Sequence, residues 1–359
     1  MKNEDKLQKR TNRQKPSRRK YIMAAAILLF LVMPVLMFIF LSQNPKPDKL
    51  SEKVIREIAA EWLSTEKGIN KNPNELTDED FAKITELQLT ERELCDIELL
   101  DKFTNLKNLD LSRIVFPPQK IPQWMKMLAK LNIYDLNKRF ILDLSPLKKL
   151  TNLQILNLSE TKISNLTPLT GLRNLHTLWI VKTQVSNIEP LKGLVELQFL
   201  DLIENPIADI KPLVDLKNLQ TLFLDITSVS DLKPIRGLKN LRTLSISGTK
   251  ISDLNPLNGL EKLNHLDLQD TQVDDPKPIK DLLNLQYLSL NNTQISDLEF
   301  IKNLNKLESL IICRTNVSDL KPLMELSNLK FLDIIGCLNI TKEQIEDLQK
   351  AFPNLKIER

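Results

Sequence analysis

The sequence predicts a stacked α/β repeat solenoid, and three observations lead to this fold class. The chain repeats itself every 22 residues from residue 131 onward. Each repeat contains an L-x-L alternation, which is typical of a short β-strand with one buried side. Helical patterns occur before the first repeat and after the last, where a stack of repeats would otherwise expose its apolar ends.

The repeat is clear when LQILNLSETKISNLTPLTGLRN, from Leu153, is compared with LRTLSISGTKISDLNPLNGLEK, from Leu241. The consensus is L-x-x-L-x-L-x-x-T-x-I-S-D-L-x-P-L-x-x-L. Its first leucine recurs at Leu153, Leu175, Leu197, Leu219, Leu241, Leu263, Leu285, Leu307 and Leu329. A proline follows fifteen residues after the turn start at Pro146, Pro168, Pro190, Pro212, Pro234, Pro256, Pro278 and Pro322, and Phe300 is the one interruption.

This pattern resembles the leucine-rich repeat proteins of the short, 22-residue class found in internalins. With degenerate turns beginning at Ile84, Leu106 and Leu131, the resemblance covers residues 84–359. It implies a right-handed horseshoe or arc with a parallel β-sheet on the concave side and short 3-10 or helical segments on the convex side. We expect about twelve turns over residues 84–340, of which the turn from Leu106 is 25 residues long.

Two columns of the repeat have predicted structural roles. A small residue at the ninth position points inward and satisfies backbone groups where the strand turns the corner. A Ser-Asp or Ser-Asn pair before Leu-x-Pro-Leu caps the short convex turn. We therefore interpret the ninth column as structural and not catalytic. Its residues are Thr161, Thr183, Asn205, Thr227, Thr249, Thr271, Thr293, Thr315 and Cys337.

A helical cap is predicted before the first repeat. The stretch SEKVIREIAAEWL has apolar residues at helical spacing, with Ser51 as a candidate N-cap. LTDEDFAKI follows, with Thr77 and Asp80 at the spacing of a capping box. Residues 51–83 are therefore expected to cover the N-terminal end of the stack.

A second cap is predicted after the last repeat. The stretch NITKEQIEDLQKAFPNLKI favours a helix from Thr341 and a final edge strand near Leu355–Ile357. Residues 341–359 are therefore expected to cover the C-terminal end.

The first 50 residues have the pattern of a basic tail, a membrane span and a spacer. Residues 1–20 carry nine Lys or Arg against two acids, and residues 22–41 contain no charged or hydrogen-bonding side chain. A helix of this length spans about 30 Å, the thickness of a bilayer core. Because the basic residues precede the apolar run, we expect a cytoplasmic tail at 1–20, a transmembrane helix at 21–41, and a spacer at 42–50. A cleaved signal peptide is the alternative, although it usually has a shorter apolar core and an A-x-A-like site.

The outward positions of the twelve predicted strands form an acidic surface without cations. These 36 positions include no Lys or Arg, whereas the 41 basic residues among the 339 after the tail would predict about four. Nucleic-acid binding requires a basic surface, so we expect none for the repeat domain. The acids on these positions are Glu86, Asp110, Asp135, Asp201, Asp225, Asp267 and Asp333.

Apolar side chains on this surface cluster on three consecutive predicted strands. Trp179 and Phe223 lie on either side of Asp201 in the middle column. Exposed aromatic residues beside an acid are typical of a binding hot spot, and the acid suits a Lys or Arg of a partner. The alternative is that the rings only pack on one another on a twisted sheet. The predicted partner-binding residues are Trp179, Val181, Phe199, Asp201, Ile203, Phe223 and Asp225.

Catalytic and metal chemistry find little support in the sequence. The two histidines, His176 and His265, lie four turns apart, about 20 Å, so they cannot share a metal or a nucleophile. A Ser-His-Asp arrangement of His265 with Ser245 or Ser289 is conceivable, but side chains on neighbouring strands offer no obvious oxyanion pocket. We therefore expect no enzyme, no cofactor and no metal. The cysteines fit neither a disulfide framework nor a zinc site, and they are Cys95, Cys313 and Cys337.

The sequence thus predicts a single-pass membrane protein whose repeat domain presents an acidic, partly aromatic surface outside the cytoplasm, in the periplasm or at the cell surface. Its predicted partner is a protein, and a basic segment would complement the surface. One alternative is a secreted or surface-exposed internalin-like adhesion or virulence factor. A less favoured alternative is an enzyme acting at the concave face. N-glycosylation triplets at Asn157 and Asn291 fall on that face. Because glycans there would lie on the concave sheet, the triplets argue against a glycosylating secretory route and favour a bacterial envelope.

Overall fold

The computed structural model describes residues 49–92, 94, 96–114 and 142–359. The chain divides into two compact units, Met1–Asp48 and Lys49–Arg359, and the described residues all belong to the second. The predicted basic tail, the transmembrane helix at 21–41 and nearly all of the spacer lie outside the described residues. Within the described part of the chain, no helix combines the length and the apolar character needed to cross a membrane.

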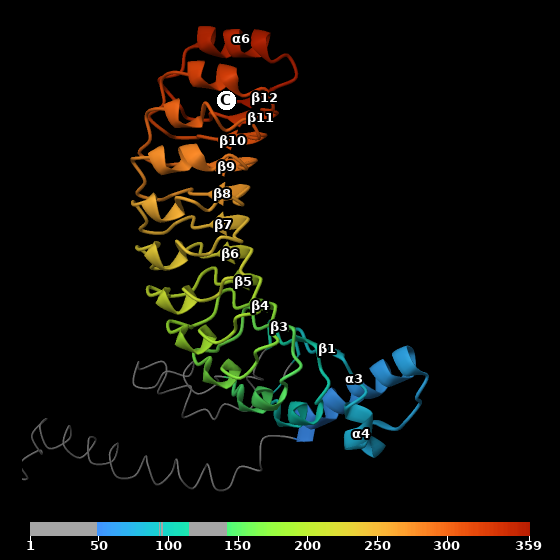
Figure 1. Cartoon of the computed structure of the whole chain (residues 1–359). Coiled ribbons are helices and arrows are strands. Elements are labelled where there is room, and N and C mark those ends of the chain that lie inside the picture. The colour runs from blue at the N-terminus through green and yellow to red at the C-terminus, as the bar shows by residue number, and fades with distance from the viewer. Residues whose placement is uncertain (1–48, 93, 95, 115–141) are drawn as a thin grey trace, which may run out of the picture. The chain divides into compact units, whose positions relative to one another are not determined.

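Twelve parallel strands in the described residues form one sheet, stacked in sequence order from β1 to β12 (Figure 1). Each strand lies beside the next in register, so that the central leucines stack on one another, as Leu200 does on Leu222. The predicted solenoid of parallel strands is confirmed. The strands are β1 (Glu86–Gln88), β2 (Asn108–Asp110), β3 (Ile155–Asn157), β4 (Thr177–Trp179), β5 (Phe199–Asp201), β6 (Thr221–Phe223), β7 (Thr243–Ser245), β8 (His265–Asp267), β9 (Tyr287–Ser289), β10 (Ser309–Ile311), β11 (Phe331–Asp333) and β12 (Lys356–Glu358).

Short 3-10 turns form the side of the stack opposite the strands (Figure 1). An Asp or Asn oxygen before each turn accepts a hydrogen bond from the backbone N–H two residues later, as Asp231 does from Lys233 at 2.9 Å. This confirms the predicted cap and identifies the Asp or Asn of the pair as the capping residue. The turns are η3 (Glu98–Lys102), η6 (Ser145–Lys149), η7 (Thr167–Leu169), η8 (Glu189–Leu191), η9 (Lys211–Leu213), η10 (Lys233–Ile235), η11 (Asn255–Leu257), η12 (Lys277–Asp281), η13 (Glu299–Ile301) and η14 (Lys321–Glu325).

A continuous column of leucine, isoleucine and valine side chains fills the interior of the stack. In a typical coil, Leu219, Leu222 and Leu224 are fully buried. The ninth-position hydroxyl closes the corner of the coil, because Thr249 Oγ1 donates to the Ile246 carbonyl at 2.6 Å. The predicted structural role of this column is confirmed. A single coil has no partner against which to bury its leucines, so the stability of each coil depends on its neighbours.

The turn predicted from Leu131 does not form a coil between its neighbours in the sheet. Strand β2 pairs directly with β3, where Leu109 lies opposite Leu156. An intervening strand would hold them about 10 Å apart. The predicted strand between them was therefore wrong, because leucine spacing alone does not determine which strands pair. Residues 115–141 lie outside the described residues, together with Asp135 and the strand assigned to it.

The coil that begins at Leu106 is completed instead by residues 142–152. Turn η6 lies against η3, and Lys149 Nζ is 2.7 Å from the Asp101 carboxylate. Asn152 also donates its side-chain N–H to the Thr104 carbonyl at 3.0 Å. The chain therefore returns to the same coil after residue 141.

The N-terminal end of the stack is covered by helices, as predicted. They are α3 (Lys49–Lys67), the 3-10 turn η2 (Pro73–Glu75) and α4 (Asp78–Phe81). Thr77 and Asp80 form the expected capping box, in which the Asp80 carboxylate accepts the Thr77 N–H at 3.0 Å. Ser51 is not an N-cap, because α3 begins at Lys49 and Ser51 lies buried inside the helix.

The C-terminal end is covered by α6 (Lys342–Ala351) and β12. Thr341 is the N-cap, and its side chain accepts the Gln344 N–H at 3.3 Å. Leu348 of this helix is fully buried. The predicted helix and edge strand are both confirmed.

Candidate functional site: an aromatic patch on the sheet face

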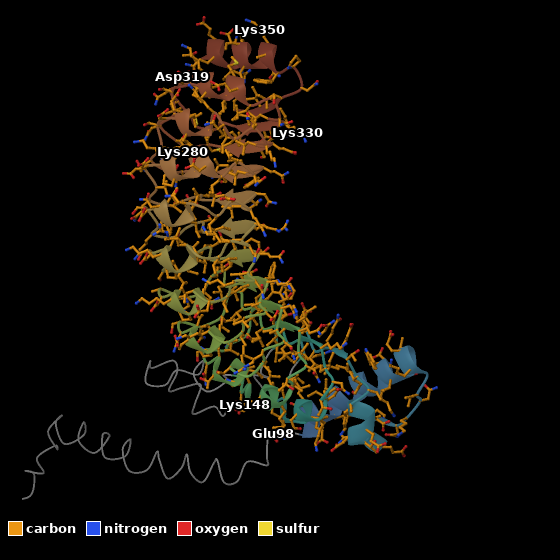
Figure 2. The ribbon with its side chains drawn as sticks, viewed as in Figure 1. Glu98, Lys148, Lys280, Asp319, Lys330 and Lys350 are labelled. Carbon is orange, nitrogen blue, oxygen red and sulfur yellow. The ribbon has the colours of Figure 1, made fainter. Side chains whose placement is uncertain are left out.

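The outward side chains of β1–β11, at three positions for each strand, form what we call the sheet face. The eleven described strands contribute 33 such residues, and none of them is Lys or Arg. Figure 2 shows Lys280 and Asp319 on the side of the 3-10 turns and Lys330 on the side of the strands, where it pairs with Glu308 just before the strand begins. The cation-free run ends at β12, where Lys356 lies opposite Phe331 with its Nζ 5.2 Å from the ring centroid.

Three aromatic rings on β4, β5 and β6 contact one another on the sheet face. The Trp179 and Phe199 ring centroids are 5.1 Å apart and tilted, and the Phe199 and Phe223 centroids are 5.7 Å apart in an edge-to-face arrangement. All three side chains are half-buried, whereas Leu178 and Ile180 are fully buried. Trp179 therefore points outward. We call these rings, with Val181 and Ile203 in the third column, the aromatic patch.

Asp201 lies in the middle of the aromatic patch, with Trp179 opposite it on one side and Phe223 on the other. Only 8% of its surface is exposed. Burial raises the pKa of Asp201 to about 6, and the negative charge of Asp225 adds to this shift, although a hydrogen bond from the Ile203 N–H opposes it. The Asp201 carboxylate is therefore largely covered, whereas the sequence predicted that it would lie open between two rings to a Lys or Arg of a partner.

Asp225 lies one strand further along, at the edge of the aromatic patch. Its carboxylate accepts hydrogen bonds from the Ser245 hydroxyl and from the Ser247 N–H, the latter at 2.9 Å. Burial raises the pKa of Asp225, and the charge of Asp267 acts in the same direction. No ion pair joins Asp201, Asp225 or Asp267 to a Lys or Arg of the described residues.

The acids of the middle column also have a structural role that the sequence did not reveal. Each accepts, on Oδ1, the backbone N–H of the residue two positions later. The distances are 2.8 Å for Asp110, 3.1 Å for Asp201, 2.9 Å for Asp267 and 3.1 Å for Asp333. Part of the acidity of the sheet face therefore serves to close the strand ends.

Ile226 lies three residues after Phe223 in the same coil and is not among the residues that the sequence predicts for the site. It follows Asp225, is 60% exposed and has φ +53°. The sequence could have indicated Ile226, because the equivalent position in the other turns holds a charged residue, asparagine or glycine. An isoleucine there departs from the column.

The histidines form no catalytic arrangement with the groups around them. His265 stacks on Tyr287, with ring centroids 4.1 Å apart and an interplanar angle of 3°, and burial lowers the pKa of His265. The Ser245 hydroxyl donates to Asp225 and not to His265. His176 precedes β4, four coils away. In the parts of the chain that the structure describes, no group of three or more His, Cys, Asp or Glu is placed to hold a metal ion.

Comparisons with known proteins agree with this architecture. The family model described as leucine-rich repeats (two copies) matches residues 151–193, 217–259 and 239–282. A search of curated proteins by sequence finds no match.

Solved structures with a similar fold include two internalins of Listeria monocytogenes. The internalin inlF is 25% identical, with a TM-score of 0.68 over 87% of this chain and 91% of the other. Internalin C2 is 28% identical, with a TM-score of 0.50 over 55% of this chain and 84% of the other. A leucine-rich repeat protein of Leptospira interrogans is 25% identical, with a TM-score of 0.67 over 79% of this chain and 69% of the other. The chain is therefore a leucine-rich repeat protein with internalin-like structural neighbours.

Proposed function

We propose that the aromatic patch binds a protein partner, with Trp179, Phe199 and Phe223 as the principal contacts. The observation that carries this proposal is that three contacting rings stay partly exposed on the sheet face, whose described outward positions on β1–β11 hold no Lys or Arg. Exposed aromatic groups that touch one another are typical of the central contacts of protein interfaces. The leucine-rich repeat fold and the internalin neighbours support a binding scaffold and not an enzyme.

The charge of the sheet face indicates the chemistry of the partner. Its six described acids are Glu86, Asp110, Asp201, Asp225, Asp267 and Asp333. A basic segment of the partner would approach this surface faster and align on it. Because Asp201 is covered, the direct cation contacts would fall on the more open carboxylates around the patch. The same charge disfavours a nucleic acid as the ligand.

We also propose that residues 21–41 hold the protein in a membrane, with residues 1–20 in the cytoplasm and the repeat unit outside it. The support for this is the uncharged twenty-residue run and the basic flank before it. The internalin neighbours favour a second candidate, a surface-exposed or released adhesion factor. Mass measurement of the purified N-terminus distinguishes the two, because loss of residues 1–42 would exclude the anchor and favour release.

The binding proposal is tested by photocrosslinking in the native membrane, with a photoreactive phenylalanine analogue at position 223. Phe199→Ala should reduce the crosslinked product strongly, since loss of a central contact weakens binding by about 2 kcal/mol, or about 30-fold. Phe331→Ala is the matched control, because Phe331 is also half-buried and lies in the same column of the sheet. Equal crosslinking in both variants would remove the aromatic patch from the interface.

A further inference from the structure

One corner of the solenoid departs from all the others in a way that bears on partner binding. In every described coil, the residue after the third outward position has a positive φ. At these corners the backbone N–H donates to a carbonyl of the next coil, as the Ile226 N–H does to the Ser247 carbonyl at 2.8 Å. These corner residues are Glu91, Arg113, Glu160, Lys182, Glu204, Ile226, Gly248, Asp270, Asn292, Arg314 and Gly336.

Ile226 is the only apolar side chain among these described corners, and it is the least suited to its backbone. A β-branched residue with φ +53° is strained, whereas glycine and asparagine adopt this conformation readily. The same chain places Gly248 and Asn292 at equivalent corners. Folding of the coil therefore does not explain an isoleucine here. Strain that folding does not require is found preferentially at functional positions.

The position of Ile226 links it to the aromatic patch. It stands at the end of β6, which carries Phe223, and follows Asp225 directly. Its side chain extends toward the next coil, because a Cβ added to Gly248 would lie 3.4 Å from Ile226 Cγ1. An exposed apolar group thus lies three residues beyond Phe223, at the corner that follows the strand carrying this ring.

The charges beside Ile226 define the chemistry of the segment that would cover it. Asp225 and the preceding corner residue Glu204 are acidic, and no outward position of the described strands β1–β11 holds a Lys or Arg. Beyond the corner, Lys250 lies one coil further, where its N–H donates to the Val229 carbonyl at 3.2 Å. A cation of the partner is therefore favoured on the strand side of Ile226, beside Asp225.

We propose that the partner-binding surface continues over this corner, and that Ile226 contacts an apolar side chain of the partner that has a Lys or Arg beside it on the strand side. This inference rests on the proposed function of the aromatic patch and extends it. It makes Ile226 a determinant of affinity that contributes no stability to the fold.

The test uses the full chain as the target for a display library of random twelve-residue peptides. Peptides that bind the parent protein and lose affinity for Phe199→Ala are ligands of the aromatic patch. Among them, we expect peptides that pair an apolar residue with an adjacent Lys or Arg to be enriched. Their dissociation constants are then measured for Ile226→Asn and for the control Arg314→Asn, which introduces asparagine at a distant corner that also has a positive φ.

Ile226→Asn should raise the dissociation constants of these peptides about tenfold. It should also raise the melting temperature of the protein by about 2 °C, because asparagine adopts a positive φ with less strain than isoleucine. Arg314→Asn should leave the affinity unchanged. An unchanged affinity for Ile226→Asn, an equal loss in both variants, or an absence of Lys and Arg among the selected peptides would overturn this inference and leave the proposed function in place. If no selected peptide depends on Phe199, the proposed function itself fails.

Discussion

Replacement of Asp201 by asparagine should stabilise the protein at neutral pH. The carboxyl has a pKa of about 6 in the folded state, compared with an ordinary value of 3.8. The difference is about 2 pKa units, and at 1.36 kcal/mol per unit it corresponds to a penalty of about 3 kcal/mol for the ionised side chain. Asparagine avoids this penalty, and its carbonyl oxygen can still accept the Ile203 N–H that now lies 3.1 Å from Oδ1.

The sign and the pH range of the effect follow from proton binding. Between about pH 4 and pH 6 the folded state holds the Asp201 proton more tightly than the unfolded chain, so this residue's contribution to stability falls as the pH rises. Below pH 4 both states are protonated and the penalty disappears. The stability difference between Asp201→Asn and the parent should therefore grow from near zero at pH 4 to about 3 kcal/mol at pH 8.

Urea unfolding at pH 4 and pH 8 measures this difference directly. Asp267→Asn is the matched control, because Asp267 occupies the same column and accepts the Gln269 N–H at 2.9 Å, but its direct neighbours in that column are Ser245 and Ser289 instead of aromatic rings. An Asp201→Asn difference that stays constant from pH 4 to pH 8, or that equals the control, would refute the role assigned to burial under the aromatic patch.

Three further predictions concern the stability of the stack, and urea unfolding measures each of them. Asp80→Ala should lower the free energy of unfolding by about 2 kcal/mol, because it removes the capping box and the ion pair with the partly exposed Lys71. These contacts hold the pKa of Asp80 well below its usual range, so the parent should lose this contribution as the pH falls below about 4. Equal acid sensitivity of parent and variant would contradict this role. Leu222→Ala should lower the free energy of unfolding by about 3 kcal/mol, because the side chain is fully buried between coils. A loss under about 1 kcal/mol would contradict the packing described. Asn240→Ala should lower the free energy of unfolding by about 1 kcal/mol, because it removes the hydrogen bond that the Asn240 side chain donates to the Lys217 carbonyl at 2.9 Å. An unchanged free energy of unfolding would show that water replaces this contact.

Local pattern was sufficient to predict the repeating part of the fold. The inward leucines, the ninth-position threonines and the caps of the 3-10 turns recur at fixed spacing, and each has a physical role within one coil or between adjacent coils. The outward direction of Trp179 follows from the same alternation, because Leu178 and Ile180 must be buried. Neighbour contacts in a solenoid lie one period apart, so the sequence by itself determined the fold, the two caps and which residues of the regular coils share the sheet face.

Only the tertiary structure decided which strands are neighbours where the period is broken. Leu131 fits the leucine spacing, yet β2 pairs directly with β3, since pairing depends on the path of the chain and not on spacing alone. The state of Asp201 was likewise hidden, because its desolvation arises from rings on three different strands that the fold brings together. The strain at Ile226 also required coordinates, because the corner of the coil has a positive φ, which no local propensity of isoleucine would favour.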